Sequence, residues 1–448
     1  GPAGLSAATA AAEAGAEVLV LDLFPAPGGQ YFMRPVAPGV PTHDRRRAAE
    51  GEGLASRALA AGVRFVGDAE VFAAWPGRLL AETPGGAIEV LARAIVVATG
   101  AHDRAFPFPG WTLPGAMTPG AAQRLAKTQG VPPGRRVVLG GSGPFLLAVA
   151  ETLIAAGCEI AAIVEARRDV VGPARLLLSS PGRWAEAARL VAAPTLARVP
   201  ILRGAMVVEA SGERSVEAVR VAPLDRGGRP EMTRARSIGP VDAVLVGWGL
   251  RPHVELPAVL GCALAFDDAL GGWHVRADAG TGATSAEGVF AAGETTGVAG
   301  LRPALAAGER AGRAAAARAA GRPQPRMGID ARARAFAVRL QRLHPVPPGV
   351  DDLMDDPVVA CRCEGVTVGT IRDACRDGAR EASGAKIWTR AGMGRCQGRI
   401  CGPAIARILA RETAVPVEAA GFNAPRIPIR PVRLASALAA VSDPSGGD

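Results

Sequence analysis

The chain of 448 residues contains little lysine, few aromatic residues and no long apolar run. Its most apolar stretch, residues 137–150, is interrupted by glycine and proline and is shorter than the roughly 20 residues that a membrane-spanning helix needs. The net charge of +9 comes almost entirely from scattered arginine, and the single tyrosine offers few platforms for base stacking. The sequence therefore predicts no transmembrane segment and no nucleic-acid partner.

Histidine is scarce as well, and the cysteines are unevenly placed. The five histidines show no metal-ligand spacing and no neighbouring nucleophile, and His102 is interpreted as a polar loop residue. Cys158, Cys262 and Cys375 stand alone, which is typical of buried packing residues. Because the other four cysteines fall in one C-terminal group, we expect a reducing, cytoplasmic location and no disulfide framework.

That C-terminal group has the spacing C-x-C, then 32 residues, then C-x₄-C: Cys361, Cys363, Cys396 and Cys401. Two tight pairs brought together by folding can surround a small inorganic centre. Pro403 suits the first turn of a helix beside Cys401, and a helix N-terminus there would favour thiolate charge. The spacing predicts a [2Fe–2S] site that moves electrons. The alternatives are zinc, whose knuckles are usually spaced C-x₂₋₄-C, and plain core cysteines.

The first residues look like the second half of a G-x-G-x-x-G dinucleotide fingerprint, with Gly1 and Gly4 as its second and third glycines. A helix of small residues should follow, and then a strand that ends at Asp22, where a carboxylate can bind a ribose. Glycine lets the backbone approach a pyrophosphate, and helix N–H groups meet its charge. We expect this chain to be a fragment that lacks the preceding strand and first glycine, and to bind its first nucleotide poorly for that reason.

A second copy of the pattern begins at Arg136 with the apolar run 137–139 and continues through Gly141 and Gly143. Its acidic end is Glu165, and a later apolar strand ends at Gly249. A carboxylate at the ribose position favours NAD over NADP, although Arg167 and its arginine neighbour weaken that inference. Two copies, each with strand, helix and acidic end, predict a protein that binds two nucleotides.

Further segments complete an α/β fold with two Rossmann-like domains. An apolar strand ends at Thr99-Gly100, another ends at Gly293-Glu294, and an alanine-rich helix from Leu301 includes Ala304. The N-terminus of that helix could stabilise negative charge on the reduced ring of a bound redox cofactor. The predicted division is a discontinuous first nucleotide domain (1–105 and 270–320), a second one (130–255), a cluster domain (357–415) and a tail (416–448). A helical insertion is expected near residues 175–199.

The order of these motifs resembles the pyridine-nucleotide-dependent flavoproteins with two dinucleotide-binding domains. That resemblance implies FAD at the first site, with Glu294 (usually Asp in that class) holding the flavin ribityl chain and Gly29-Gln30 approaching the flavin. The disulfide reductases of the class carry a redox cysteine pair beside the flavin, but no cysteine precedes Cys158 here. Thioredoxin-reductase chemistry is therefore excluded. In the proteins it resembles, the second site can hold NAD(P) or another adenine nucleotide without turning it over.

A narrower resemblance covers nearly the whole chain through ATGAHDRAFPFPGWTLPG, VLGGSGPFLL and the segment CRCEGVT…TRAGMGRCQGRIC. These segments look like the large flavin subunit of heteromeric amino-acid and opine dehydrogenases, whose C-terminal region resembles bacterioferritin-associated ferredoxin. The resemblance implies a [2Fe–2S] cluster on the four cysteines and a smaller amine-oxidase-type flavoprotein partner, through which peripheral membrane association is possible. No catalytic residue is nominated. The alternatives are a stand-alone NAD(P)H-dependent reductase and a non-enzymatic scaffold protein.

Overall fold

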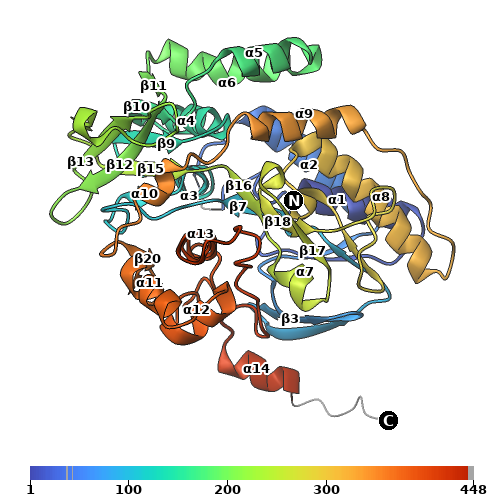
Figure 1. The fold of residues 1–448 in the computed structure, drawn as a ribbon. Helices are drawn as coiled ribbons and strands as arrows, with labels where there is room; N and C mark the ends of the chain where they lie inside the picture. Colours follow the sequence, from blue (N-terminus) through green and yellow to red (C-terminus); the bar gives the residue numbers. More distant parts are fainter. Residues whose placement is uncertain (37–38, 43, 442–448) are drawn as a thin grey trace.

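The computed structural model describes residues 1–36, 39–42 and 44–441. Its elements form three neighbouring parts: one built on α1 and α8, one built on β9 and β10, and one that contains α11, α12 and α13 (Figure 1). His43, one of the histidines considered above, lies outside the described residues. No described helix combines the length and apolar composition needed to cross a bilayer.

The first part is organised by helix α1 (Pro2–Glu13) and helix α8 (Leu301–Ala319), which pack closely together. A Cβ on Gly308 would lie 2.2 Å from the carbonyl oxygen of Ala3, and one on Gly312 would lie 2.1 Å from that of Ala7. Only glycine permits two helix backbones to approach so closely. Beside them, β6 (Ile95–Val97) pairs in parallel with β19 (Val289–Ala291). The other elements are β1 (Leu19–Leu21), α2 (Arg45–Ala60), β2 (Arg64–Val66), β3 (Glu70–Trp75), β4 (Arg78–Thr83), β5 (Gly86–Leu91), α7 (Glu255–Val259), β17 (Leu264–Asp267), η4 (Asp268–Leu270), β18 (Gly272–Val275) and η5 (Gly293–Thr296).

The second part contains a parallel sheet in the order β11-β10-β9-β15-β8. Its central strand carries the consecutive apolar residues Val137, Val138 and Leu139, all fully buried, as expected of a parallel strand covered on both faces. An antiparallel sheet, β12-β13-β14, adjoins it. The bounds are β8 (Ala116–Met117), α3 (Pro119–Arg124), η1 (Leu125–Gln129), β9 (Arg136–Gly141), α4 (Phe145–Ala155), β10 (Glu159–Glu165), β11 (Ile201–Arg203), β12 (Ala205–Ser211), β13 (Ala218–Pro223), η3 (Met232–Arg234), β14 (Arg236–Ile238) and β15 (Ala243–Gly247).

The predicted helical insertion is present, and it begins earlier than expected. It consists of α5 (Val171–Leu178), η2 (Pro181–Arg183) and α6 (Trp184–Leu196), which project at the top of Figure 1. Helix α6 is fastened to α4 by a salt bridge from Arg189 to Glu151 at 2.5 Å. Helix α9 (Ala331–Arg342) continues the same layer toward the linker that contains His344.

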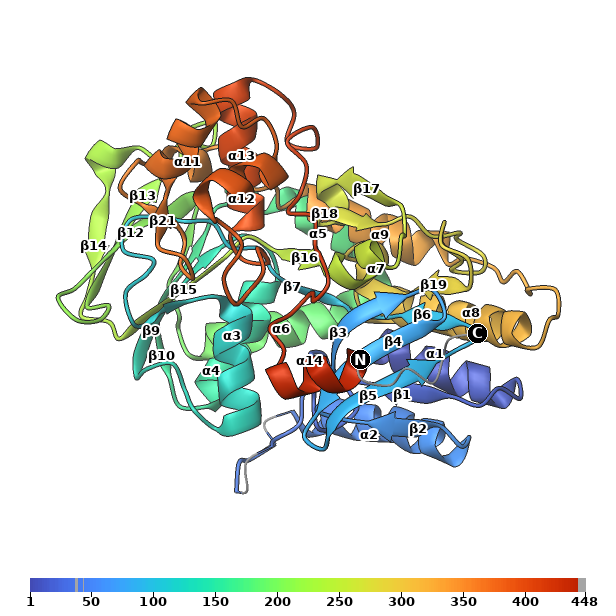
Figure 2. The ribbon, with the colours of Figure 1, turned by 90° about the horizontal axis from the view of Figure 1, so that it is seen from below.

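The third part contains the four clustered cysteines. Its elements are α10 (Gly349–Asp352), β20 (Val359–Cys361), β21 (Val366–Thr367), α11 (Val368–Arg376), α12 (Ala382–Thr389) and α13 (Gly402–Thr413). The Thr367 side chain caps α11, and Cys401 is the N-cap of α13, so both helix starts agree with the sequence. Cys375 is buried on α11, which confirms that it is a packing residue. Helix α14 (Leu434–Val441) then lies against β5, and Arg433 pairs with Glu82 (Figure 2).

Trp111 has a contact that the sequence did not suggest. Its indole N–H donates to the carbonyl oxygen of Val359 at 2.7 Å. The guanidinium of Arg362 lies over its ring at 4.0 Å from the centroid. Trp111 therefore anchors the segment that carries Cys361 and Cys363 to the rest of the chain.

Candidate functional site

One large cavity lies where the three parts meet. It has a volume of about 2500 Å³ and is lined by both glycine turns, by the start of α8 and by the loop that carries Cys396. A group bound at the first glycine turn therefore shares a continuous space with this cysteine.

Most of the residues predicted to bind the first nucleotide line this cavity. Gly1 and Gly29 meet backbone to backbone, since a Cβ on Gly29 would lie 2.6 Å from the Cα of Gly1. Gly293 is the exception: it does not line the cavity, and a Cβ there would lie 2.6 Å from the Cβ of Ala3. Its role is to let the end of β19 approach α1. The lining members are Gly1, Gly4, Asp22, Gly29, Gln30, Thr99, Gly100, Glu294 and Ala304.

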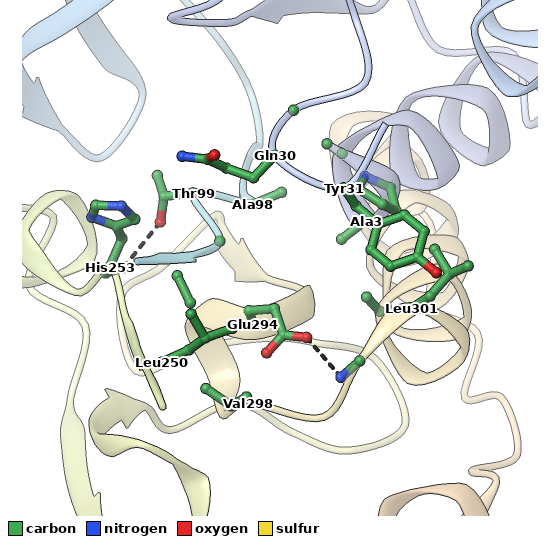
Figure 3. Close-up of a pocket in the computed structure, with 18 of the residues that line it drawn as sticks. Ala3, Gln30, Tyr31, Ala98, Thr99, Leu250, His253, Glu294, Val298 and Leu301 are labelled. Carbon is green, nitrogen blue, oxygen red and sulfur yellow. Dashed lines mark hydrogen bonds between the residues drawn. The ribbon is translucent and has the colours of Figure 1, made fainter. Parts of the chain in front are cut away.

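The wall of this end of the cavity includes Glu294 and His253 (Figure 3). The Glu294 carboxylate accepts hydrogen bonds from the backbone N–H groups of Ala299 at 3.0 Å and Gly300 at 2.7 Å. Gly300 is the N-cap of α8, so Glu294 fixes the turn that begins this helix. Burial raises the pKa of Glu294. A glycine-lined cradle that faces a helix N-terminus fits an extended dinucleotide.

The second nucleotide site is only partly open. Gly143 and Glu165 line the cavity, whereas Gly141 and Gly249 do not. Gly141 allows a close backbone approach instead, because a Cβ on it would lie 1.7 Å from the carbonyl oxygen of Gly247. Two of the four predicted residues therefore lie away from the open space, and the other two face it.

The Glu165 carboxylate is already hydrogen-bonded to the second glycine turn. It accepts hydrogen bonds from the Ser142 hydroxyl at 3.0 Å and from the N–H groups of Gly143 and Arg167, both at 3.1 Å. His344 lies beside this turn, 3.9 Å from the position of a Cβ on Gly143. A ribose hydroxyl at Glu165 would have to share or replace these bonds.

The four predicted cluster cysteines lie together. The thiol of Cys401 contacts those of Cys361 and Cys396, and the thiol of Cys363 contacts that of Cys396. Cys361 and Cys401 are buried, Cys396 is half-buried and Cys363 is exposed. Among the described residues, no group of three or more His, Cys, Asp or Glu side chains is placed to hold a single metal ion. Four neighbouring thiols match the four-cysteine ligand set of a [2Fe–2S] cluster.

Backbone N–H groups surround these sulfurs. Gly392 donates to the Cys361 sulfur at 3.5 Å, and Gly398 donates to that of Cys396. The Cys401 thiol and these amides lower the pKa of Cys361 to about 6 and that of Cys396 to about 5, while the pKa of Cys401 is raised. Cys361 and Cys396 are thus the two thiols of the group that deprotonate most readily, and deprotonated thiols ligate iron.

The residue Asn423 was missed by the sequence reasoning. It packs against Gly392 and Gly398, and its amide nitrogen and oxygen are buried without hydrogen-bond partners among the described residues. A Cβ on either glycine would collide with this side chain. Its position 22 residues after Cys401 gave no signal, because the return of the tail over the cluster loop is a tertiary contact.

Matches to two known families cover the parts described above. Residues 1–321 match the pyridine nucleotide-disulphide oxidoreductase family, and residues 359–411 match the BFD-like [2Fe–2S] binding domain. The first match contains both glycine turns, and the second contains all four clustered cysteines.

Known proteins resemble the chain along most of its length. It is 32% identical to one of the subunits of the opine oxidase of Rhizobium meliloti (strain 1021), over 97% of this chain and 96% of that protein. It is 33% identical to hydrogen cyanide synthase subunit HcnB of Pseudomonas aeruginosa, over 75% and 74% of the two chains. The solved L-proline dehydrogenase from P. horikoshii shares the fold with a TM-score of 0.68 and 19% identity, over 97% of this chain and 77% of that one.

Proposed function

Because the chain belongs to the pyridine nucleotide-disulphide oxidoreductase family, and is an FAD-dependent oxidoreductase with a BFD-like [2Fe–2S] domain, we propose that it transfers electrons within a heteromeric amino-acid or opine dehydrogenase. The observation that carries the proposal is the shared cavity, which joins the first glycine turn to Cys396. Flavin handles two electrons and a cluster handles one, so the pair can divide a hydride equivalent.

The site residues are assigned on the same basis. FAD is assigned to the lining residues Gly1, Gly4, Asp22, Gly29, Gln30, Thr99, Gly100, Glu294 and Ala304, with Gly293 letting the end of β19 approach α1. The second nucleotide is assigned to Gly143 and Glu165, while Gly141 and Gly249 of the predicted set lie away from the open space. The cluster is assigned to Cys361, Cys363, Cys396 and Cys401. The domain division given above follows the same assignment. The three cysteines outside the cluster, Cys158, Cys262 and Cys375, are unpaired thiols, which supports the proposed cytoplasmic location.

In this proposal the residues of the chain bind and orient, and no general base is assigned among them. The glycine turn lets the backbone approach a pyrophosphate, and the N–H groups at the start of α8, held by Glu294, meet negative charge. The amides of Gly392 and Gly398 stabilise thiolates at the cluster. These roles suit an electron-transferring subunit whose substrate is oxidised on a partner.

The partner in this proposal is a smaller amine-oxidase-type flavoprotein, and the substrate is proline, hydroxyproline, glycine or an octopine-type opine. Support comes from the relatives, which are named as subunits of opine oxidase and hydrogen cyanide synthase. Co-expression with a small flavoprotein encoded beside this chain should give a stable complex that oxidises one of these substrates. Full turnover of an amine by the isolated chain, at the rate of the complex, would overturn the proposal.

A stand-alone NAD(P)H-dependent reductase is the second candidate. The observation in its favour is that Gly143 and Glu165 face the cavity. Against it, Glu165 is bonded to its own turn and His344 lies beside that turn. Anaerobic addition of NADH separates the two candidates, because rapid bleaching of the flavin favours the reductase and an unchanged spectrum favours the dehydrogenase component.

A further inference from the structure

Five polar residues form a connection between the two redox sites, which we call the polar bridge: His102, Arg251, His253, Glu255 and Arg399. His102 on β7 (Ala101–Asp103) is paired across the ladder with Arg251 on β16 (Leu250–Pro252). His253 follows β16, and Glu255 is the first residue of α7. Arg399 comes from a distant part of the sequence, the loop between Cys396 and Cys401.

The contacts of the polar bridge are direct. The rings of His102 and His253 are in contact, with centroids 4.2 Å apart and planes tilted by 37°. The Glu255 carboxylate lies 3.3 Å from Arg251, 3.6 Å from His253 and 3.9 Å from Arg399. Glu255 therefore lies within 4 Å of Arg251, His253 and Arg399.

The bridge contacts the cluster loop at one end. Arg251 and His102 both meet the carbonyl oxygen of Arg399, at 2.9 Å and 3.1 Å. The Arg399 guanidinium donates to the carbonyl oxygens of Cys396 and Ile429, each at 3.1 Å. The positive charge of Arg399 is thus fixed next to a predicted cluster ligand.

The bridge reaches the flavin end through His253. Its carbonyl oxygen accepts hydrogen bonds from the hydroxyls of Thr99 at 3.0 Å and Thr295 at 2.7 Å, and Thr99 lines the cavity beside Glu294 (Figure 3). His253, Glu255 and Arg399 line the same cavity. The polar bridge therefore spans the distance from the flavin end to the cluster loop.

The charges of the bridge follow from its burial. Glu255 is 6% exposed and Arg399 is 7% exposed. Burial lowers the pKa of both histidines and keeps them neutral, whereas the bond to His253 and the two arginines outweigh burial and hold the pKa of Glu255 well below its usual range. Two arginines against one carboxylate leave one net positive charge. Arg399 Nε and His102 Nδ1 have no hydrogen-bond partner among the described residues.

We propose that the polar bridge sets the reduction potential of the [2Fe–2S] cluster, with Arg399 supplying the positive charge that favours the added electron and Glu255 positioning and partly offsetting it. Cluster potentials respond to net charge and to hydrogen bonds around the ligands. The inference rests on the cluster assignment within the proposed function, but not on the substrate or the partner. The buried charge of Arg399 lies in the loop between two cluster cysteines and acts through a low dielectric. Its removal should therefore shift the reduction potential measurably.

The test is an EPR-monitored redox titration of the full chain, with iron and sulfide assayed in each variant. Arg399→Met should decrease the equilibrium constant for one-electron reduction of the cluster about tenfold. This corresponds to a reduction potential lower by ~59 mV. Glu255→Gln, which removes a negative charge, should raise it. Arg399→Lys keeps the charge and should remain near the parent value. Glu151→Gln is the control, since Glu151 pairs with Arg189 between α4 and α6, away from the bridge.

Shifts of opposite sign are the signature of a charge effect, because a merely structural disturbance would not change sign with the charge removed. Equal shifts for Arg399→Met and Arg399→Lys, or a lowered potential in Glu255→Gln, would overturn the inference. If Arg399→Met fails to load iron, the sign of the Glu255→Gln shift still decides. Failure of the proposed substrate leaves this result untouched, since no substrate enters the titration.

Discussion

Replacing Gly312 by alanine tests whether the contact between α1 and α8 is what shapes the flavin end of the cavity. The new Cβ would lie 2.1 Å from the carbonyl oxygen of Ala7, far inside the ~3.5 Å at which non-bonded heavy atoms make favourable contacts. The obstacle is backbone, which has no rotamer to change. The helices must therefore separate, and α1 carries the glycine turn.

The expected loss can be worked out from two opposing effects. Overpacking of a tight interface costs about 1–3 kcal/mol, and alanine regains up to about 1 kcal/mol of helix propensity over glycine. The net loss of about 1–2 kcal/mol should lower the Tm by about 1–2 °C, because the entropy of unfolding grows with the length of this 448-residue chain. Flavin fluorescence released on heating reports the transition, and bound FAD should fall as well.

Gly53→Ala is the matched control, because Gly53 is exposed on α2 and no atom lies within 4 Å of its Cβ position. This substitution should raise stability by about 0.4–1 kcal/mol. A Gly312→Ala variant with the Tm and FAD content of the parent chain would refute the reasoning.

Three further predictions concern thiols, histidines and a lysine. Cys396→Ser should lose most bound iron, whereas Cys375→Ser, a buried thiol on α11, should keep it; iron assays decide. Burial lowers the pKa of His102 and His253 in the folded chain, so the unfolded chain binds more protons than the folded chain as the pH falls through about 6.5. The urea concentration at the unfolding midpoint should therefore decrease between pH 7 and pH 5, and it should decrease less steeply in His102→Asn. The same pH dependence in both proteins would contradict this. Burial and nearby Arg47 lower the pKa of Lys127 to about 8, so its acylation, followed by mass spectrometry, should rise near pH 8 rather than near pH 10.

Much of the fold could be predicted because its signals are local. The second nucleotide pattern was predicted to have its acidic end at Glu165, which is the last residue of β10, and the apolar strands predicted to end near residues 100, 249 and 293 correspond to β6, β15 and β19. Consecutive apolar residues bounded by glycine describe a buried parallel strand without any tertiary knowledge. The family matches agree with the class of fold inferred from these motifs.

The candidate site was only partly predictable. The spacing of the four cysteines was sufficient to group them, but nothing near His102 indicated that its ring contacts that of His253. That contact depends on the pairing of β7 with β16, which brings together residues about 150 positions apart. Likewise Glu294 was expected at the flavin, and its bonds to the turn before α8 follow from the local path of the chain.

Metal, sulfide and flavin analysis of anaerobically purified full-length chain tests the central claim most directly. The account predicts FAD together with about two iron and two sulfide per chain, as in a [2Fe–2S] cluster, and an EPR signal that appears on reduction and disappears in Cys396→Ser. Zinc in place of iron at the four cysteines, or iron retained undiminished in that variant, would contradict it.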